Sequence, residues 1–204
     1  MIRAIVFDMG GVLADLDKEL CLRTFREELG YTQLEAMIGV SAQKGIFGEM
    51  ELGVRSAEEF CDAILTGCRE GARREDVVRC LETFITGVPR EKTDLMERLA
   101  LQYPLYFLSN NNPIAMAKIR RCFRENGFDW EKWIRKEFIS CDMHLMKPGK
   151  EIFLAAIAEI GLPPEEILFI DDAQPNVDAA VALGLRAVRY EPGTDLEKLI
   201  SEEL

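Results

Sequence analysis

The stretch that decides the fold is Met1–Asp17, which reads MIRAIVFDMGGVLADLD. Its apolar run from Ala4 to Phe7 is rich in β-branched and aromatic side chains, which predicts a buried strand. Asp8 follows directly, at the edge where open α/β sheets bind ligands, and a buried carboxylate is costly unless something pairs with it. Gly10 and Gly11 then allow the backbone to turn tightly beside a ligand. Taken alone, the pattern is more often an ordinary turn than a site.

Length and composition are those of one globular core, with room for an inserted module. The chain has 204 residues, of which 48% are hydrophobic and 30% charged. The formal net charge of −11 argues against nucleic acid or an anionic membrane as the main partner, and an anionic substrate would need a local positive site or a metal. The sequence has no apolar run of the roughly 18 residues that a membrane span requires.

Cysteine and histidine usage narrows the protein class further. The six cysteines are scattered without a C-x-x-C pair, which indicates reduced thiols in a cytoplasmic protein. The first strand begins at Ile2, which leaves no room for a signal peptide. The single histidine, His144, argues against a histidine-based zinc site and against a serine–histidine hydrolase.

The chain from Asp17 to Pro89 has helical periodicity and no convincing strand. Four segments carry it: Leu20–Leu29, Thr32–Ile38, Ser56–Leu65 and Arg73–Ile85. Thr32 and Ser56 each have a glutamate three residues later, which predicts a capping box. We therefore expect residues 17–89 to form a helical cap, inserted into a core made of residues 1–16 and 90–204. Periodicity does not distinguish a lid over Asp8 from helices that only fill a core.

From Glu91 onward, apolar runs alternate with helical segments. The expected strands are Leu105–Leu108, Phe138–Ser140, Ile167–Ile170 and Ala187–Arg189, and the longer helices between them are Glu91–Gln102, Ile114–Asn126, Gly149–Ile160 and Val177–Leu183. Such alternation predicts an α/β fold with a parallel sheet and right-handed crossovers.

Polar side chains of complementary chemistry follow the predicted strands. They are Asp8, the pair Ser109 and Asn110, and the pair Asp171 and Asp172, with Lys147 placed just before a helix. Since parallel strands share one carboxyl edge, we expect these groups to lie together. Carboxylates repel one another, and Mg²⁺, which prefers oxygen ligands with substrate phosphate completing its shell, would neutralise them. Each residue alone could be a helix cap, a solvated turn or a surface lysine, but their common position at element boundaries argues against coincidence.

With these motifs the sequence resembles the haloacid dehalogenase superfamily. Four segments match the four motifs of that superfamily in order: Phe7–Leu13, Leu108–Asn110, Lys147–Pro148, and Phe169–Asp172 with Asn176. The resemblance covers essentially the whole chain. It implies a Rossmann-like core sheet with a helical-bundle cap inserted after the first strand.

The resemblance also implies roles for individual residues. Asp8 would be the nucleophile and a metal ligand. Ser109 and Asn110 would bind the phosphoryl group, and Lys147 would stabilise its charge. Asp172 would be the Mg²⁺ ligand of the fourth motif, with Asp171 in support.

One position departs from the usual phosphatase pattern. The family places a second aspartate, the general acid and base, two residues after the nucleophile, where this chain has Gly10. The backbone carbonyl of Gly10 could still bind the metal, but no side chain remains there to move a proton. Asp15 and Asp17 are the nearest carboxyls in the sequence. The pattern is similar to a branch of sugar-phosphate phosphatases, among them an α-glucose-1-phosphate phosphatase with glycine at this place.

The resemblance therefore implies a Mg²⁺-dependent phosphatase that hydrolyses a small phosphorylated metabolite, such as a sugar phosphate, through an aspartyl-phosphate. One alternative, motivated by Gly10, is a catalytically impaired relative that binds a phosphorylated ligand or a partner protein. Another is a 2-haloacid dehalogenase, which would leave the pair Asp171 and Asp172 unexplained. Within the cap, we expect the stretch around Phe47 and Arg55 to face the site. The oligomeric state does not follow from the sequence.

Overall fold

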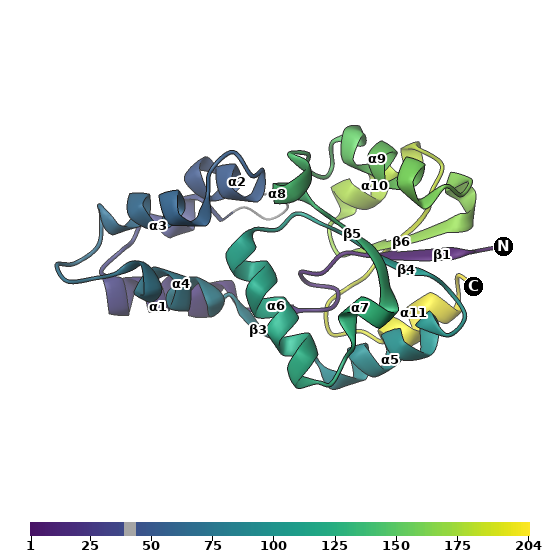
Figure 1. Ribbon diagram of the computed structural model, residues 1–204, viewed down its shortest axis with the longest axis horizontal. Coiled ribbons are helices and arrows are strands. Elements are labelled where there is room, and N and C mark those ends of the chain that lie inside the picture. Colours follow the sequence, from purple (N-terminus) through teal and green to yellow (C-terminus); the bar gives the residue numbers. More distant parts are fainter. Residues whose placement is uncertain (39–43) are drawn as a thin grey trace.

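The computed structural model describes residues 1–38 and 44–204 and has a five-stranded parallel sheet at its centre (Figure 1). The strand order is β5-β4-β1-β6-β7. The strands are β1 (Ala4–Phe7), β4 (Leu105–Ser109), β5 (Ile134–Ile139), β6 (Ile167–Asp171) and β7 (Arg186–Arg189). This confirms the α/β prediction and puts β1, with Asp8 after it, in the middle of the sheet.

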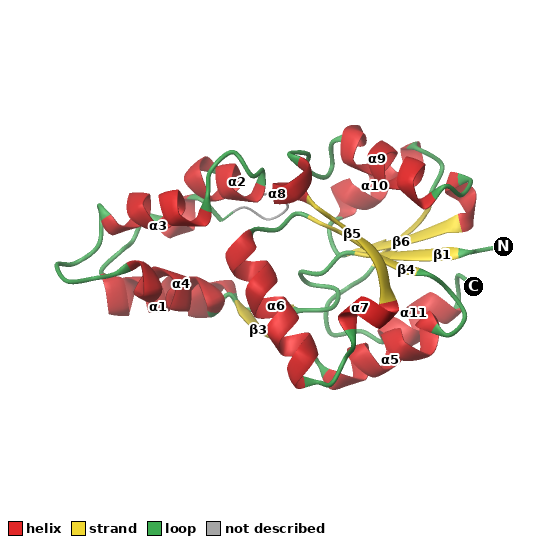
Figure 2. Ribbon diagram, in the orientation of Figure 1, coloured by secondary structure: helices red, strands yellow, loops and turns green. Residues whose placement is uncertain are grey.

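Helices cover both faces of the sheet (Figure 2). On one face lie α5 (Arg90–Ala100), α6 (Pro113–Glu125), α7 (Trp130–Trp133) and α11 (Leu196–Ser201), and on the other lie α9 (Lys150–Ile160) and α10 (Gln174–Ala182). The short helix α8 (Ser140–Met143) follows β5, and the 3₁₀ turn η2 (Pro164–Glu166) precedes β6. Because both faces are covered, strand β1 is a continuous apolar run rather than an alternating one.

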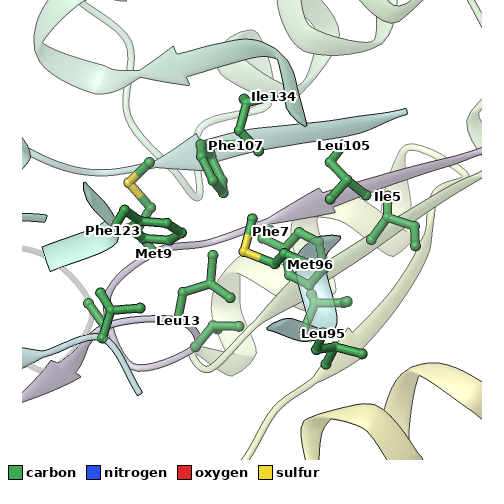
Figure 3. Close-up of a cluster of buried hydrophobic side chains, with 14 of the residues drawn as sticks. Ile5, Phe7, Met9, Leu13, Leu95, Met96, Leu105, Phe107, Phe123 and Ile134 are labelled. Atoms are coloured by element: carbon green, nitrogen blue, oxygen red, sulfur yellow. The ribbon is translucent and has the colours of Figure 1, made fainter. Parts of the chain in front are cut away.

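The two faces of β1 enter different hydrophobic clusters. Ile5 and Phe7 point into the larger cluster, where Phe7 lies near Phe107 and Phe123 (Figure 3). Val6 belongs to the cluster on the opposite face. All four residues of β1 are at most 1% exposed. This burial holds the strand rigidly and so fixes the place at which Asp8 emerges.

The cap helices form a hydrophobic cluster of their own. They are α1 (Lys18–Leu29), the 3₁₀ turn η1 (Leu34–Ala36), α2 (Gly45–Glu51), α3 (Ala57–Leu65) and α4 (Arg74–Glu82). Phe25, Phe47 and Phe60 are fully buried in this cluster, to which α6 of the core contributes Ile114. This separate cluster supports the division that we propose, with a cap of residues 17–89 and a core of residues 1–16 and 90–204.

The helix predicted near the start of the cap and its capping box are both wrong. The helix predicted over Thr32–Ile38 is only the 3₁₀ turn η1, whose N-cap residue is Gln33 and not Thr32. One turn is enough to bury Leu34 and Ile38 in the cap cluster, so no longer helix is needed. By contrast, the capping box of Ser56 is confirmed, because the Glu59 N–H donates to Ser56 Oγ at 3.1 Å and the Ser56 N–H donates to Glu59 at 2.8 Å.

The segment expected to end the last cap helix is instead a strand. Helix α4 ends at Glu82, and β3 (Ile85–Gly87) pairs antiparallel with β2 (Asp15–Leu16). Ile85 is compatible with both structures, because its apolar side chain fits the helical spacing and its β-branched shape suits a strand. The pairing with Leu16 decides the outcome and ties together the two crossings between cap and core. No helix within the described ranges is long and apolar enough to cross a membrane.

Candidate functional site

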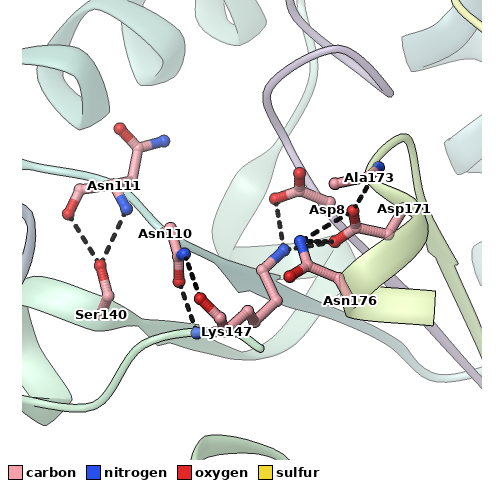
Figure 4. A network of polar contacts seen from close by, with 8 residues as sticks. All are labelled: Asp8, Asn110, Asn111, Ser140, Lys147, Asp171, Ala173 and Asn176. Atoms are coloured by element: carbon pink, nitrogen blue, oxygen red, sulfur yellow. Dashed lines mark hydrogen bonds and ion pairs between the residues drawn. The ribbon is translucent and has the colours of Figure 1, made fainter. Parts of the chain in front are cut away.

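The carboxyl edge of the sheet brings Asp8, Asn110, Lys147 and Asp171 together, as Figure 4 shows. The Asp8 N–H donates to Ile170 O at 2.8 Å, which extends the pairing of β1 with β6 and leaves the Asp8 carboxylate at the end of the sheet. The Lys147 ammonium lies 3.0 Å from Asp8 Oδ1 and 2.6 Å from Asp171 Oδ2. All three side chains are buried. The site is therefore built around one buried cation between two buried carboxylates.

Burial and charge set the protonation of these groups. Burial alone would lower the pKa of Lys147, but Asp171 and Asp8 outweigh it and leave the pKa raised, so the ammonium stays charged. Burial raises the pKa of Asp8 to about 7, against the opposing effect of Lys147. Burial and the neighbouring Asp171 likewise raise the pKa of Asp172.

Asp171 and Asp172 differ sharply in their surroundings. Asp171 is fully buried, and its oxygens accept hydrogen bonds from the Ala173 N–H at 2.8 Å, from Asn176 Nδ2 at 3.0 and 3.1 Å, and from Lys147 at 2.6 Å. Asp172 is only partly buried and lines the cavity. Asp171 is thus occupied in holding Lys147, whereas Asp172 faces the space in which a ligand would bind.

The residues at this edge fit a divalent cation. Oxygens of Asp8, Asp171 and Asp172 lie within 4.8 Å of one another. Lys147 supplies one positive charge against these three carboxylates, which leaves a local excess of negative charge when all of them are ionised. Hard oxygen ligands of this kind suit Mg²⁺. We propose Asp8, Asp172 and the backbone carbonyl of Gly10 as its ligands, because all three residues line the cavity.

The second motif positions the lysine. Asn110 Nδ2 donates to Lys147 O and the Lys147 N–H donates to Asn110 Oδ1, both at 2.8 Å. Ser109, the last residue of β4, is buried and opposes the rise in the pKa of the Asp8 carboxyl. Of the two residues that the sequence assigns to phosphoryl binding, Asn110 therefore also fixes the position of Lys147.

The two glycines of the first motif meet different constraints. Gly11 has a φ of +76°, and a Cβ there would overlap the carboxylate of Asp172. Gly10 has an ordinary φ, and a Cβ there would meet, among the described atoms, only Leu16 Cδ1 at 3.4 Å. The close approach of strand end and Asp172 thus requires glycine at position 11 but not at position 10.

The two carboxyls nearest to Gly10 in the sequence are used elsewhere. Asp15 is paired with Lys92 at 3.1 Å. Asp17 caps α1 by accepting a hydrogen bond from the Leu20 N–H at 2.8 Å. Neither belongs to the described lining of the cavity over Asp8. The structure therefore does not bring the sequence candidates for proton transfer to the site.

Core and cap together enclose a cavity of about 140 Å³ over Asp8. The core side has the polar groups Asp8, Asn110, Lys147, Asp172 and Asn176, and the cap side adds Phe47, Glu51, Leu81, Phe84 and Ile85. Of the two cap residues expected to face the site, Phe47 does so. Arg55 instead pairs with Glu49 at 2.8 Å.

Two further polar residues near the site were missed by the sequence reasoning. Ser140, the first residue after β5, donates from Oγ to Glu51 O at 2.5 Å and accepts from the Asn111 N–H at 2.9 Å. A polar residue directly after a strand was the available signal for Ser140. No sequence signal pointed to Glu51, because an acidic residue in a cap helix is most often exposed to solvent.

Comparison with known proteins identifies what the chain is similar to. The family model for haloacid dehalogenase-like hydrolases matches residues 2–184. A D-ribitol-5-phosphate phosphatase of Bacteroides thetaiotaomicron is 32% identical over 196 residues, covering 96% of this chain and 95% of the relative.

Two solved structures match almost the whole chain. The first is a haloacid dehalogenase (HAD) family enzyme of Bacteroides thetaiotaomicron in complex with magnesium and inorganic phosphate. It is 30% identical to this chain with a TM-score of 0.90, and the match covers 98% of this chain and 99% of that one. A HAD-like family hydrolase of Porphyromonas gingivalis is 34% identical with a TM-score of 0.88, covering 99% and 97%.

The raised pKa of Asp8 predicts a pH-dependent gain in stability for Asp8→Asn. The folded protein holds this proton more tightly than the unfolded chain, so its stabilising effect is complete below the unfolded pKa of 3.8 and is lost as the pH rises through about 7. At pH 8 the free energy of unfolding of the metal-free Asn variant should therefore exceed that of wild type by up to about 4 kcal/mol. The variant should accordingly unfold at a higher temperature. The difference should vanish toward pH 4.

Thermal unfolding in a chelator across this pH range measures the effect. The matched control is Asp94→Asn, which removes an exposed carboxyl whose nearest cation lies 3.8 Å away. A lower unfolding temperature for Asp8→Asn than for wild type at pH 8 would contradict the assignment of a destabilising buried charge.

Proposed function

This chain belongs to the family of haloacid dehalogenase-like hydrolases, and we propose that Asp8 is the nucleophile with which it hydrolyses phosphate monoesters. The protein is a magnesium-dependent phosphatase of small phosphorylated metabolites. The observation that carries the proposal is the arrangement of Asp8, Lys147 and Asp172 around one small cavity. A nucleophile, a fixed cation and a carboxylate open to a metal are the parts that phosphoryl transfer requires.

The reaction proceeds by two displacements at phosphorus. A carboxylate oxygen of Asp8 attacks the phosphorus atom, the bond from phosphorus to the ester oxygen breaks, and the leaving oxygen takes a proton from solvent. A water molecule then attacks the aspartyl-phosphate at phosphorus and loses a proton to solvent, and the bond from phosphorus to Asp8 breaks, which releases inorganic phosphate and restores the carboxylate. Covalent catalysis divides one difficult displacement into two easier ones.

The surrounding residues stabilise the charge of the transferring group. Lys147 donates to the phosphoryl oxygens, and its position depends on Asp171 and on the backbone clamp by Asn110. Asp8, Asp172 and the Gly10 carbonyl would hold Mg²⁺, which neutralises negative charge on the phosphoryl group when bound. The second amide hydrogen of Asn110 and the hydroxyl of Ser109 complete the donors for that group.

The cap adds an apolar wall to the site. Its apolar residues Phe47, Leu81 and Phe84 face the cavity opposite Asp8 and exclude water. The similarity to a D-ribitol-5-phosphate phosphatase supports a polyol or sugar phosphate as the substrate.

The alternatives explain less of the site. A 2-haloacid dehalogenase would use Asp8 but gives no role to the open carboxylate of Asp172. An impaired relative could use Lys147 to bind a phosphorylated ligand, but it gives no role to the carboxylate of Asp8 buried 3.0 Å from that lysine. We also propose the cytoplasm as the location, because all six cysteines are unpaired thiols.

Asp8→Asn tests the proposed function directly. The amide is nearly isosteric but a poor nucleophile, so turnover should fall by at least about 10⁴-fold while the protein remains folded. Phosphate release from a panel of small phosphate esters, with Mg²⁺ and with a chelator, gives the measurement, and circular dichroism checks the fold. Undiminished turnover in the folded variant would refute the role of Asp8. The absence of turnover in wild type on every ester would favour the impaired relative.

The different surroundings of Asp171 and Asp172 predict different losses. Asp172→Asn should weaken Mg²⁺ binding by roughly 10- to 100-fold, because it removes a ligand. Asp171→Asn should affect binding of Mg²⁺ less but should lower stability, because Lys147 loses its closest counter-ion. Calorimetric titration with Mg²⁺ and thermal unfolding separate the two effects. If Asp171→Asn weakens Mg²⁺ binding more, the two assignments are reversed.

The absence of a side chain at Gly10 predicts a dependence on the leaving group. General acid assistance contributes roughly 10²- to 10⁴-fold, and esters with poorly acidic alcohols need it most. Wild type should therefore have a higher kcat on aryl and anomeric phosphates than on alkyl ones, polyol phosphates included. Because position 10 has an ordinary φ and room for a Cβ, Gly10→Asp should raise turnover of alkyl esters selectively. Rates that do not vary with the acidity of the leaving alcohol would mean that another group already transfers the proton.

A further inference from the structure

Asn111, in the loop between β4 and α6, is a buried residue of the cavity lining that has no part in the reaction described above. We propose that its side-chain amide donates a hydrogen bond to a hydroxyl oxygen on the alcohol part of the substrate. This bond would select polyol phosphates over unhydroxylated alkyl phosphates. The inference rests on the proposed phosphatase function and deepens it by assigning one residue to its substrate preference.

The other polar groups of Asn111 all have partners within the protein. Its N–H donates to Ser140 Oγ at 2.9 Å, and its backbone carbonyl lies 3.2 Å from the same hydroxyl. Its Oδ1 accepts from the Asn112 N–H at 3.0 Å. Because a backbone N–H only donates, the side-chain atom that faces it must be the oxygen. This leaves Nδ2, which has no hydrogen-bond partner among the described residues.

The Nδ2 atom of Asn111 is open to the cavity over Asp8. Asn111 is only 6% exposed, yet it lines that cavity. Its Nδ2 is not one of the side-chain atoms that are both fully buried and without a partner in the described ranges, so part of its surface is accessible. An amide nitrogen only donates, so the complementary group on a ligand must be an acceptor.

The position of Asn111 indicates which part of the substrate it meets. In Figure 4, Asn111 lies on the side of Asn110 away from Asp8. Ser140, which holds the backbone of Asn111, also donates to Glu51 O of α2 at 2.5 Å, so this loop lies where the core meets the cap. With the phosphoryl group bound at Asp8, the alcohol part of the ester extends toward this junction. On a neutral polyol chain, the available acceptors are hydroxyl oxygens.

The amide of Asn111 is held in one orientation before a ligand binds. The bond from the Asn112 N–H fixes the side chain, and Ser140 fixes the backbone. A hydrogen bond discriminates between ligands only if the protein group that makes it is held in place. The apolar side chains of the cap favour carbon over hydroxyl groups, so a preference for polyols requires a polar group such as this amide on the core side of the cavity.

The test compares two esters with the same number of carbon atoms, D-ribitol 5-phosphate and pentyl phosphate, in the presence of Mg²⁺. Wild type should have the higher kcat/KM for the ribitol ester. Asn111→Leu, which is close in size but has no donor, should reduce the ratio of the two kcat/KM values by roughly 3- to 10-fold, mainly through the KM of the ribitol ester. Differences in reactivity between the two alcohols cancel when this ratio is compared with that of wild type.

The matched control is Asn126→Leu, which makes the same change at the C-terminal end of α6. Asn126 also uses its amide nitrogen, which donates to Val88 O at 2.9 Å, but it lies outside the described lining of the cavity. This variant should keep the wild-type ratio of the two esters.

A second measurement does not depend on the folding of the Leu variant. In Asp8→Asn, which should bind esters without hydrolysing them, NMR follows the side-chain NH₂ signals of the asparagines in the presence of Mg²⁺. The signal of Asn111 should shift when D-ribitol 5-phosphate is added and much less when pentyl phosphate is added. The signal of Asn126 should shift with neither ester.

Several outcomes would overturn the inference. Equal losses on both esters in a folded Asn111→Leu variant would make Asn111 a structural or phosphoryl-binding residue, as would equal shifts of its NH₂ signal with both esters. An Asn111 signal that shifts with neither ester would also refute the proposed contact. Wild-type turnover without preference for the ribitol ester would refute the inference but leave the phosphatase function standing. No phosphate release from any ester, p-nitrophenyl phosphate included, would refute both.

Discussion

The site depends on one interaction, the buried contact of the Lys147 ammonium with the carboxylates of Asp8 and Asp171. Removing these charges from water is costly, and the cost is reduced because the cation and the carboxylates lie within hydrogen-bond distance and Asp171 accepts further bonds from Asn176 and Ala173. The result is an asymmetric pair of carboxylates around one lysine. Asp171 has its hydrogen-bonding capacity filled and acts as the support, whereas Asp8 faces the cavity and can react.

The architecture explains why this network can form at all. Parallel strands bring three loops to one edge, and β1 at the centre of the sheet gives Asp8 neighbours on both sides. The cap enters and leaves the core through the paired segments β2 and β3, so its helices lie over that same edge. Ile85 of β3 lines the cavity, and Ser140 joins the end of β5 to α2. The core therefore contributes a charged surface to one small space, and the cap contributes a largely apolar one that includes Glu51.

The sequence predicted most of the core but less of the cap. Asp8 and Asp172 directly follow buried apolar strands, so their meeting follows from parallel topology. Lys147 lies in the loop between α8 and α9, and its backbone is held by Asn110. The fate of Thr32–Ile38 and of Ile85 depended instead on tertiary packing and on a strand partner distant in sequence, and local periodicity contains neither. Glu51 looks like any acidic helix residue until the fold buries it. The sequence also did not predict the contacts of Asp15 and Asp17, because residues close to Gly10 in sequence need not lie close to it in space.

The most direct test of the account is a crystal structure of the protein with Mg²⁺ and beryllium trifluoride, which mimics a phosphoryl group bound to a carboxylate. We expect the beryllium fluoride group bound to a carboxylate oxygen of Asp8. Mg²⁺ should be held by Asp8, Asp172 and the Gly10 carbonyl, and Lys147 should contact the beryllium fluoride group while it keeps its bond to Asp171. An adduct on another residue, or Mg²⁺ bound by Asp171 with Lys147 displaced from it, would contradict the account.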